Sequence, residues 1–300
     1  MGRESVLFPV TWKKSQWPVA SQVRGEMNGW SLPRGNQALP GAGPFAGDDD
    51  VVDFESGSSI PQNFLYWRFP ADGAFQVAPK GHPNALRVRP SRANLSGPVN
   101  STEKALTGKL GLSFIGRKQA HTFFSYTVDL LFTPNNSDQE AGVTVFLTQP
   151  NHISLGLAKT PGKKNRYELR FRTTTTTSTN THTTPVPQTW NLAQNLRLEI
   201  STFNETHYVF SAHPADRAKD RLVLGYADTQ IVSGDSGPFT GALIGVYATC
   251  NGAGEKDLVF CPPGGDAFFG RWRYTGIGQK VDFSRVVHSD ADGHTRIAVP

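Results

Sequence analysis

The amino-acid sequence predicts an all-β protein built as an antiparallel β-sandwich. From residue 51 onward, short segments alternate apolar and polar side chains with a period of two, and turn-forming residues separate them. No stretch shows a sustained apolar period of 3.6 residues, which would indicate an amphipathic helix. Thirty glycines and 21 prolines among 300 residues suit short strands joined by turns, and 37% hydrophobic residues supply a core.

The predicted strands follow one another at short intervals along the chain. They are residues 64–69, 85–89, 121–132, 143–147, 153–157, 167–172, 196–200, 207–212, 222–226, 242–248 and 268–274. Alternation is clearest in residues 121–132, where one face, expected in the core, carries Phe124, Tyr126, Val128, Leu130 and Phe132. For Trp67, Trp190 and Trp272 we likewise expect core packing rather than sugar binding.

The two ends of the chain differ from the sandwich. Residues 1–20 contain one β-rich strand at 5–12, and because a lone strand cannot bury its faces, we expect this segment to belong to another domain. Residues 21–50 are rich in Gly, Pro and Asn and are predicted to be a linker. The sandwich is expected to span residues 51–278, followed by a polar tail at 279–300.

Residues 173–184 form a threonine-rich segment of low complexity. It fits either a mobile, O-glycosylated loop or a β-prone edge strand. Its composition favours the loop.

Charge and hydropathy argue against two classes of partner. The net charge is +5, but Lys and Arg are scattered and no recognition motif accompanies them, so nucleic-acid binding is not expected. No apolar run reaches the roughly 20 residues of a membrane span, so no membrane partner is expected.

Cysteines and glycosylation triplets bear on the compartment. Cys250 and Cys261 are two free thiols in the cytosol or one disulfide in an oxidising compartment. Four N-x-[ST] triplets favour the second alternative and predict glycosylation at Asn94, Asn100, Asn135 and Asn204. No signal peptide is visible after Met1, so we expect either a cytosolic protein or part of a longer, extracellular one.

No catalytic residues are predicted. Glycoside hydrolysis needs two carboxylates roughly 5–10 Å apart whose environments separate their pKa values. The candidates occupy turns or alternating solvent-facing positions, and no pair stands out: Asp129, Asp138, Glu140, Glu168, Glu199 and Asp228. No nucleophile elbow or zinc-binding motif is present either.

Several ordered motifs resemble a known family. Residues 114–121, 140–146 and 152–156, then 239–248 and 269–274, closely resemble the C-terminal sandwich of glycoside hydrolase family 43 enzymes. The resemblance implies a concanavalin A-like (jelly-roll) β-sandwich packed against a five-bladed catalytic propeller. The segments 2–12 and 17–19 resemble the last strand of that propeller, so residues 1–20 are expected to be its remnant, and the catalytic carboxylates to lie outside this chain.

The resemblance also implies roles for three residues. Arg3 matches an arginine expected at the substrate pocket, and Phe239 falls where related enzymes present an aromatic ring to the catalytic domain. Asp53 lies at the start of the sandwich, where some relatives hold structural calcium, the one cofactor that we consider. Gly270 stands where the family usually has Asp, which weakens the calcium assignment.

Together these features predict a non-catalytic accessory domain of a family 43 glycosidase. It would stabilise or complete the propeller active site and associate with xylan or arabinoxylan. One alternative is a β-xylosidase or α-L-arabinofuranosidase in its own right or as part of a longer chain. Another is a truncated gene product without independent function.

Overall fold

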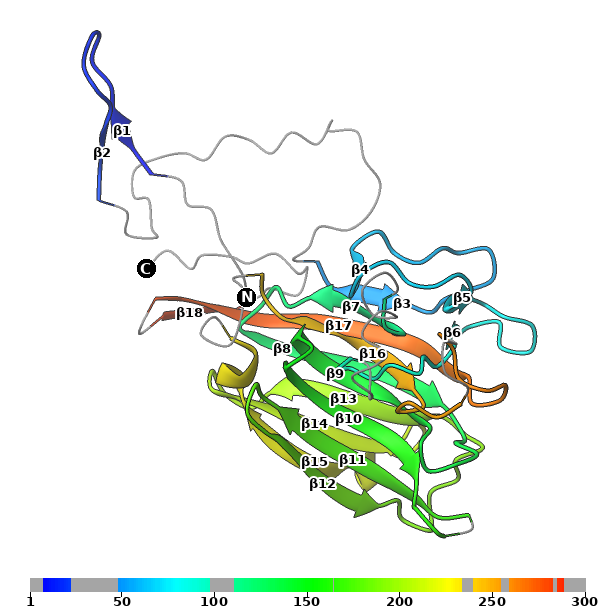
Figure 1. Cartoon of the computed structure of the whole chain (residues 1–300). Helices are drawn as coiled ribbons and strands as arrows, with labels where there is room; N and C mark the ends of the chain where they lie inside the picture. The colour runs from blue at the N-terminus through cyan, green and yellow to red at the C-terminus, as the bar shows by residue number, and fades with distance from the viewer. Residues whose placement is uncertain are drawn as a thin grey trace.

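The computed structural model describes residues 8–22, 48–97, 111–163, 165–233, 240–254, 259–282 and 285–288. Within them, two large antiparallel sheets pack face to face (Figure 1). The helical segments in these ranges are short 3₁₀ turns, among them η2 (Ala218–Asp220) and η3 (Thr229–Val232). The all-β sandwich that alternation predicted is confirmed.

The first sheet has seven strands, and its outer face carries the candidate site. Its order is β12 (Thr179–Pro185), β11 (Tyr167–Thr174), β10 (Asn151–Lys159), β9 (Glu140–Thr148), β16 (Leu243–Thr249), β7 (Phe114–Lys118) and β4 (Phe64–Tyr66). Every neighbouring pair is antiparallel.

The second sheet has nine strands. Its main path is β15 (Leu222–Asp228), β14 (His207–Pro214), β13 (Leu196–Thr202), β8 (Phe123–Leu131), β17 (Ala267–Asp282), β6 (Leu86–Val88) and β5 (Phe75–Val77). β3 (Asp50–Val52) and β18 (Arg285–His288) also pair with β17. The long strand β17 therefore organises this sheet.

The core lies between the two sheets and follows the predicted alternation. Phe124, Tyr126, Val128, Leu130 and Phe132 are all buried in it. Residues from the inner face of the seven-stranded sheet join the same cluster, among them Val143, Val145, Ile153, Leu155 and Ile244. Trp190 and Trp272 belong to it as expected, whereas Trp67 packs on a smaller cluster outside it.

A buried ion pair links the two sheets. The Arg117 guanidinium on β7 lies 3.0 Å from the Asp50 carboxylate on β3, and both side chains are nearly inaccessible to solvent. Trp272 on β17 donates its indole N–H to Asp50 at 3.1 Å, and the guanidinium also lies 3.8 Å from the ring centre of Tyr274. Because unpaired charges are costly in an interior, these partners must come together when the sheets pack.

The threonine-rich segment is an edge strand rather than the expected loop. β12 pairs with β11 over seven residues, from Thr174 opposite Thr179 to Glu168 opposite Pro185. Its side chains are mostly exposed. The loop prediction was wrong because threonine favours an extended backbone. Pairing with β11 then satisfies the backbone N–H and C=O groups along one edge of β12.

Both ends of the described chain also differ in detail from the prediction. β17 continues to Asp282 and pairs with β18, so the sheet extends past residue 278, where a polar tail was expected. Near the other end, β1 (Val10–Thr11) and β2 (Val19–Ala20) form a two-stranded sheet of their own. Most of the expected linker lies outside the described residues.

Candidate functional site

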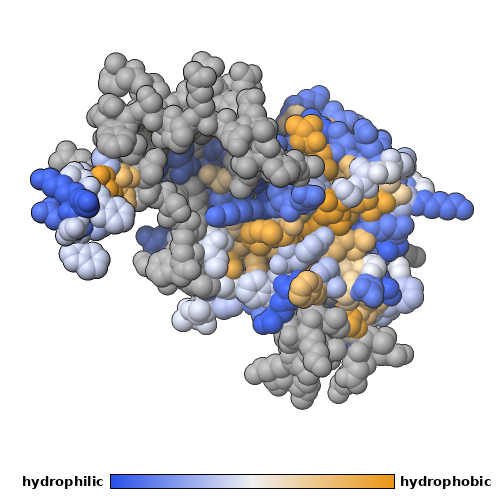
Figure 2. All heavy atoms as spheres, turned by 90° about the horizontal axis from the view of Figure 1, so that it is seen from above, coloured by the Kyte–Doolittle hydropathy of each residue, from blue (hydrophilic) through white to orange (hydrophobic). Residues whose placement is uncertain are grey.

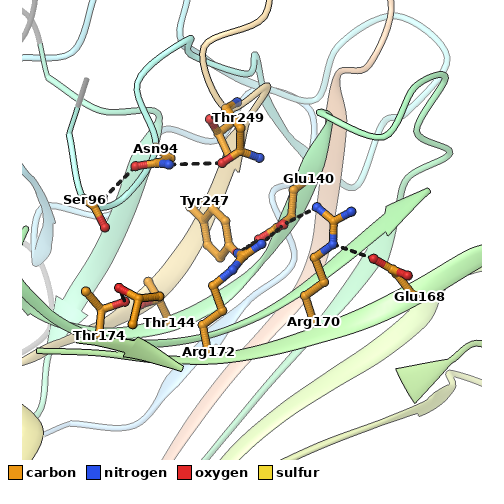
Figure 3. Close-up of polar contacts among 12 residues, drawn as sticks. Asn94, Ser96, Glu140, Thr144, Glu168, Arg170, Arg172, Thr174, Tyr247 and Thr249 are labelled. Atoms are coloured by element: carbon orange, nitrogen blue, oxygen red, sulfur yellow. Dashed lines mark hydrogen bonds and ion pairs between the residues drawn. The ribbon is translucent and has the colours of Figure 1, made fainter. Parts of the chain in front are cut away.

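The candidate site occupies the outer face of the seven-stranded sheet, on the side away from the core. Successive side chains of a strand point to opposite faces. Core residues such as Ala141 and Leu155 therefore alternate with outward-facing Glu140, Ser154 and Arg172. Figure 3 shows this group of polar side chains above β9 to β12 and β16.

A fully buried carboxylate lies at the centre of this face. Glu140 accepts hydrogen bonds from both terminal nitrogens of Arg172, one of them at 2.7 Å, and from the Tyr247 hydroxyl at 2.7 Å (Figure 3). Arg170 donates to the same carboxylate at 3.2 Å and to Glu168 at 2.8 Å. Two arginines and two carboxylates therefore form one network in which the formal charges balance.

The environment fixes the protonation state of each central group. Burial by itself would raise the pKa of Glu140, but the charge and hydrogen bonds of Arg172 and the Tyr247 hydroxyl lower it overall. Burial would lower the pKa of Arg172, but Glu140 raises it. Burial also raises the pKa of Tyr247 well above its ordinary value. Glu140 is thus a stable anion in a closed network, which does not suit a general acid.

A glycine at position 156 leaves room for this network. Gly142 on β9 lies opposite both Gly156 on β10 and Tyr247 on β16. A Cβ atom at Gly156 would lie 2.5 Å from the Tyr247 hydroxyl and 2.7 Å from Cγ of Glu140. The missing side chain allows Tyr247 and Glu140 to meet above β10.

A pocket of about 260 Å³ opens beside the network. The residues that line it are mostly polar: Asn94, Leu95, Ser96, Glu140, His152, Ser154, Arg172, Thr174, Thr179, Tyr247, Thr249 and Asn251. Strands form the floor, and residues 94–96 form a wall. That wall is fixed by a hydrogen bond of 3.1 Å from the Asn94 amide to Asn251.

A small apolar cluster holds this wall on the sheet. Leu95 is buried with Leu112, Phe114, Phe146 and Tyr247, all outside the main core. Burying a leucine side chain contributes about 1.5–3 kcal/mol. The pocket wall is therefore anchored by hydrophobic contact as well as by hydrogen bonds.

His152 lies in the pocket floor as a neutral imidazole. Its Nδ1 lies 2.9 Å from the Gln149 carbonyl oxygen, to which it donates, and its ring stacks on Phe146 with 5.9 Å between ring centres. Burial lowers its pKa to about 4, although hydrogen bonds to backbone carbonyls oppose the shift.

The other carboxylates considered as catalytic candidates mostly have structural partners. Asp129 forms a two-point ion pair with Arg197 at 2.7 and 3.0 Å, and Glu199 binds Arg221 and Ser211. Asp228 caps η3 by accepting from the Gln230 backbone N–H.

The solvent-facing assignment was wrong for two of these carboxylates, because Arg170, Arg172 and Tyr247 enclose Glu140 and Arg197 covers Asp129. Glu140 is 0% exposed and Asp129 only 7%. Arg170, Arg172 and Tyr247 were not singled out from the sequence. The one available signal was the placement of two arginines two residues apart, on the same face of an alternating strand.

The predicted calcium site does not fit the residues around Asp53. Its carboxylate is paired with Arg273 at 2.7 Å, so a cationic partner already occupies it. No group of three or more His, Cys, Asp or Glu side chains able to hold a metal occurs among the described residues.

The remaining predicted site residues fall in three places. Arg3, Phe239 and Asn100 lie outside the described residues. Cys250 and Cys261 form a disulfide with 5.9 Å between their Cα atoms. Of the glycosylation triplets, Asn135 and Asn204 lie on exposed turns, whereas Asn94 is half-buried in the pocket wall.

Replacing Glu140 by Gln should destabilise the fold strongly. The substitution leaves the partly buried Arg172 without its counter-charge, a loss on the order of 3 kcal/mol in the free energy of unfolding. The matched change Glu205→Gln removes an exposed partner of Lys280 and should cost under about 1 kcal/mol. Urea unfolding of both variants measures the difference, and equal losses would contradict a structural role for the network.

His152 should make stability depend on pH between about 6.5 and 4. The unfolded chain takes up a proton near the ordinary pKa of 6.5, the folded chain only near 4. The stabilisation is therefore fully present above pH 6.5 and is lost as the pH falls toward 4, by about 3 kcal/mol.

Unfolding titrations at a series of pH values test this dependence. His152→Gln should have a shallower slope than the wild type. His182→Gln, which alters an exposed residue on β12, should keep the wild-type slope. Parallel curves for all three proteins would refute the assignment.

Comparison with known proteins places the chain in a family. Residues 51–260 match the model of the β-xylosidase C-terminal concanavalin A-like domain. The chain is 26% identical over 253 residues to a non-reducing end α-L-arabinofuranosidase of Bacteroides ovatus. The aligned region covers 84% of this chain and 42% of that protein.

Solved structures agree in fold. The Bacteroides ovatus xyloglucan PUL GH43B protein matches with a TM-score of 0.65 and 25% identity, covering 91% of this chain and 47% of that one. A xylan β-1,4-xylosidase from Bacillus halodurans shares the fold with a TM-score of 0.66 at 19% identity, again over 91% and 47%. The chain thus spans less than half the length of these relatives.

No helix in the described part of the chain is long and apolar enough to cross a membrane.

The match to the family model covers most of the sandwich, including the strands that form the pocket floor and the motif that carries Glu140. The chain therefore belongs to the family of β-xylosidase C-terminal concanavalin A-like domains found in glycoside hydrolase family 43 enzymes.

Proposed function

We propose that this chain is a non-catalytic accessory domain of a family 43 glycosidase, which packs against a catalytic propeller and associates with xylan or arabinoxylan. One observation carries the non-catalytic part. Four of the six candidate carboxylates, Asp129, Glu140, Glu168 and Glu199, are held in ion pairs with arginines. A hydrolase instead needs two carboxylates poised with separated pKa values around an open cleft.

Exposed apolar surface supports a propeller partner. Trp12 and Trp17 in the N-terminal hairpin are 75% and 90% exposed. The sandwich also exposes Val51 on β3 and Leu65 on β4, and Figure 2 shows apolar residues gathered on its face seen from above. Large exposed apolar patches are typical of protein interfaces, and the family 43 relatives matched above are about twice as long as this chain.

The related arabinofuranosidase and xylosidase suggest the substrates of the whole enzyme. The names of these two proteins refer to non-reducing α-L-arabinofuranosyl ends and to xylan. We infer that a propeller joined to this sandwich would act on the same class of plant cell-wall polysaccharide.

The purified 300-residue chain should show no turnover of 4-nitrophenyl α-L-arabinofuranoside or 4-nitrophenyl β-D-xyloside. It should nevertheless be retarded in native gels that contain arabinoxylan. The Bacteroides ovatus arabinofuranosidase serves as the positive control for activity, and a gel without polysaccharide as the control for migration. Robust turnover would overturn the non-catalytic assignment in favour of an enzyme in its own right, and unretarded migration would remove the carbohydrate association.

We also propose that the parent protein is extracellular. The Cys250–Cys261 disulfide and the two exposed glycosylation triplets fit an oxidising compartment. When the chain is secreted from a eukaryotic host, mass spectrometry of its glycopeptides should find glycans at Asn135 and Asn204, and little at Asn94. Asn94 differs because its amide is bonded to Asn251 inside the pocket wall. Full occupancy at Asn94 with none at the two exposed sites would contradict this assignment of accessible and shielded triplets.

A further inference from the structure

The pocket above β9 to β12 has a specific chemical character. Its lining combines five serine and threonine hydroxyls, the Tyr247 hydroxyl, two amides, one neutral imidazole, one leucine and the paired charges of Glu140 and Arg172. We propose that this pocket binds one neutral sugar unit, at the end of a polysaccharide or on one of its branches. The inference rests on the carbohydrate association proposed above and gives it a location.

The charge balance of the pocket favours a neutral ligand. Arg172 directs its terminal nitrogens at Glu140, which is 0% exposed, and Arg170 shares its charge between Glu140 and Glu168. An anionic ligand would compete with a buried carboxylate for these guanidinium groups. A cationic ligand would meet arginine first, since the carboxylate lies beneath it.

The lining groups match the hydrogen-bonding needs of sugar hydroxyls. Each sugar hydroxyl both donates and accepts, so it needs partners of both kinds. The hydroxyls of Ser96, Ser154, Thr174 and Thr179 can rotate to serve as either donor or acceptor. The Thr249 hydroxyl is already used, because it donates to the Ala93 carbonyl oxygen and accepts from the Asn251 backbone N–H. The Asn251 amide accepts from Asn94 and donates to the Asp138 carbonyl oxygen, so it holds the pocket wall in place.

The size and position of the pocket favour a single ring. Pockets for drug-sized ligands have volumes of roughly 300–1,000 Å³, and this one has about 260 Å³. Thr179 lies on its rim, exposed on edge strand β12. Thr181 and Thr183 lie on the same face of that strand and continue the hydroxyl-bearing surface outward, where the rest of a chain could lie.

The test measures sugar binding by the full 300-residue chain with ligand-observed and ¹⁵N-resolved NMR titrations. The probes are methyl β-D-xylopyranoside, methyl α-L-arabinofuranoside and, as the charged comparison, D-glucuronate. Thr179→Trp fills the rim of the pocket. Asn180→Trp places the same bulk on the next residue of β12, which points to the opposite face and lies outside the pocket. Thermal unfolding checks that both variants are folded.

We expect at least one neutral glycoside to bind the wild type and Asn180→Trp with similar affinity. Thr179→Trp should bind it at least tenfold more weakly, and glucuronate should not bind. If Thr179→Trp fails to fold, Ser96→Trp on the loop wall replaces it. The proposal would be overturned if the wild type bound no glycoside, or if glucuronate bound as strongly as the glycosides. It would also be overturned if both variants bound the glycoside equally well, or if both lost glycoside binding to the same extent.

The arabinoxylan gel separates this failure from that of the broader function. Suppose that the gel retards the wild type and Thr179→Trp equally, and that the wild type binds no monosaccharide glycoside. The carbohydrate association would then stand, but the pocket would not be its site. Loss of retardation in Thr179→Trp alone would support both.

Discussion

The buried carboxylate of Glu140 is the constraint on which the outer face of the seven-stranded sheet depends. A charge removed from water is tolerated only when it is closely paired and hydrogen-bonded. Arg172 and Arg170 on β11 and Tyr247 on β16 supply those partners. The requirement ties together three strands, and it leaves beside them a pocket in which the formal charges balance.

A second buried ion pair has a different task. Arg117 and Asp50 join β7 in one sheet to β3, and Trp272 adds β17 of the other. Burial raises the pKa of Asp50 although Arg117 opposes the shift, whereas the pKa of Glu140 is lowered. At Glu140 the two arginines and the Tyr247 hydroxyl outweigh burial, whereas at Asp50 Arg117 and the hydrogen bonds from Trp272 and Asn63 do not. The Arg117–Asp50 pair fixes how the sheets meet, whereas the Glu140 network shapes a surface.

The sequence predicted the fold better than the site, for a physical reason. Alternation of side chains is local, so it predicted the inner face of β8 and the strands around it correctly. Burial of an outward-facing residue depends on neighbours far away in the sequence, such as Tyr247, which lies 107 positions beyond Glu140. The pocket wall at residues 94–96 is likewise held by distant partners. The threonine run was misjudged because its pairing, rather than its composition, decided its conformation.

The close approach of Tyr247 to Gly156 has a consequence for how this domain can diverge. The position of a methyl group at residue 156 is already taken by the tyrosine hydroxyl and by Glu140. The sizes of these side chains are therefore not independent, and a larger residue at 156 requires a smaller one at 247 or a shorter acid at 140. In a lineage that had abandoned the buried carboxylate, the glycine would lose its reason to persist, and all three positions would drift together.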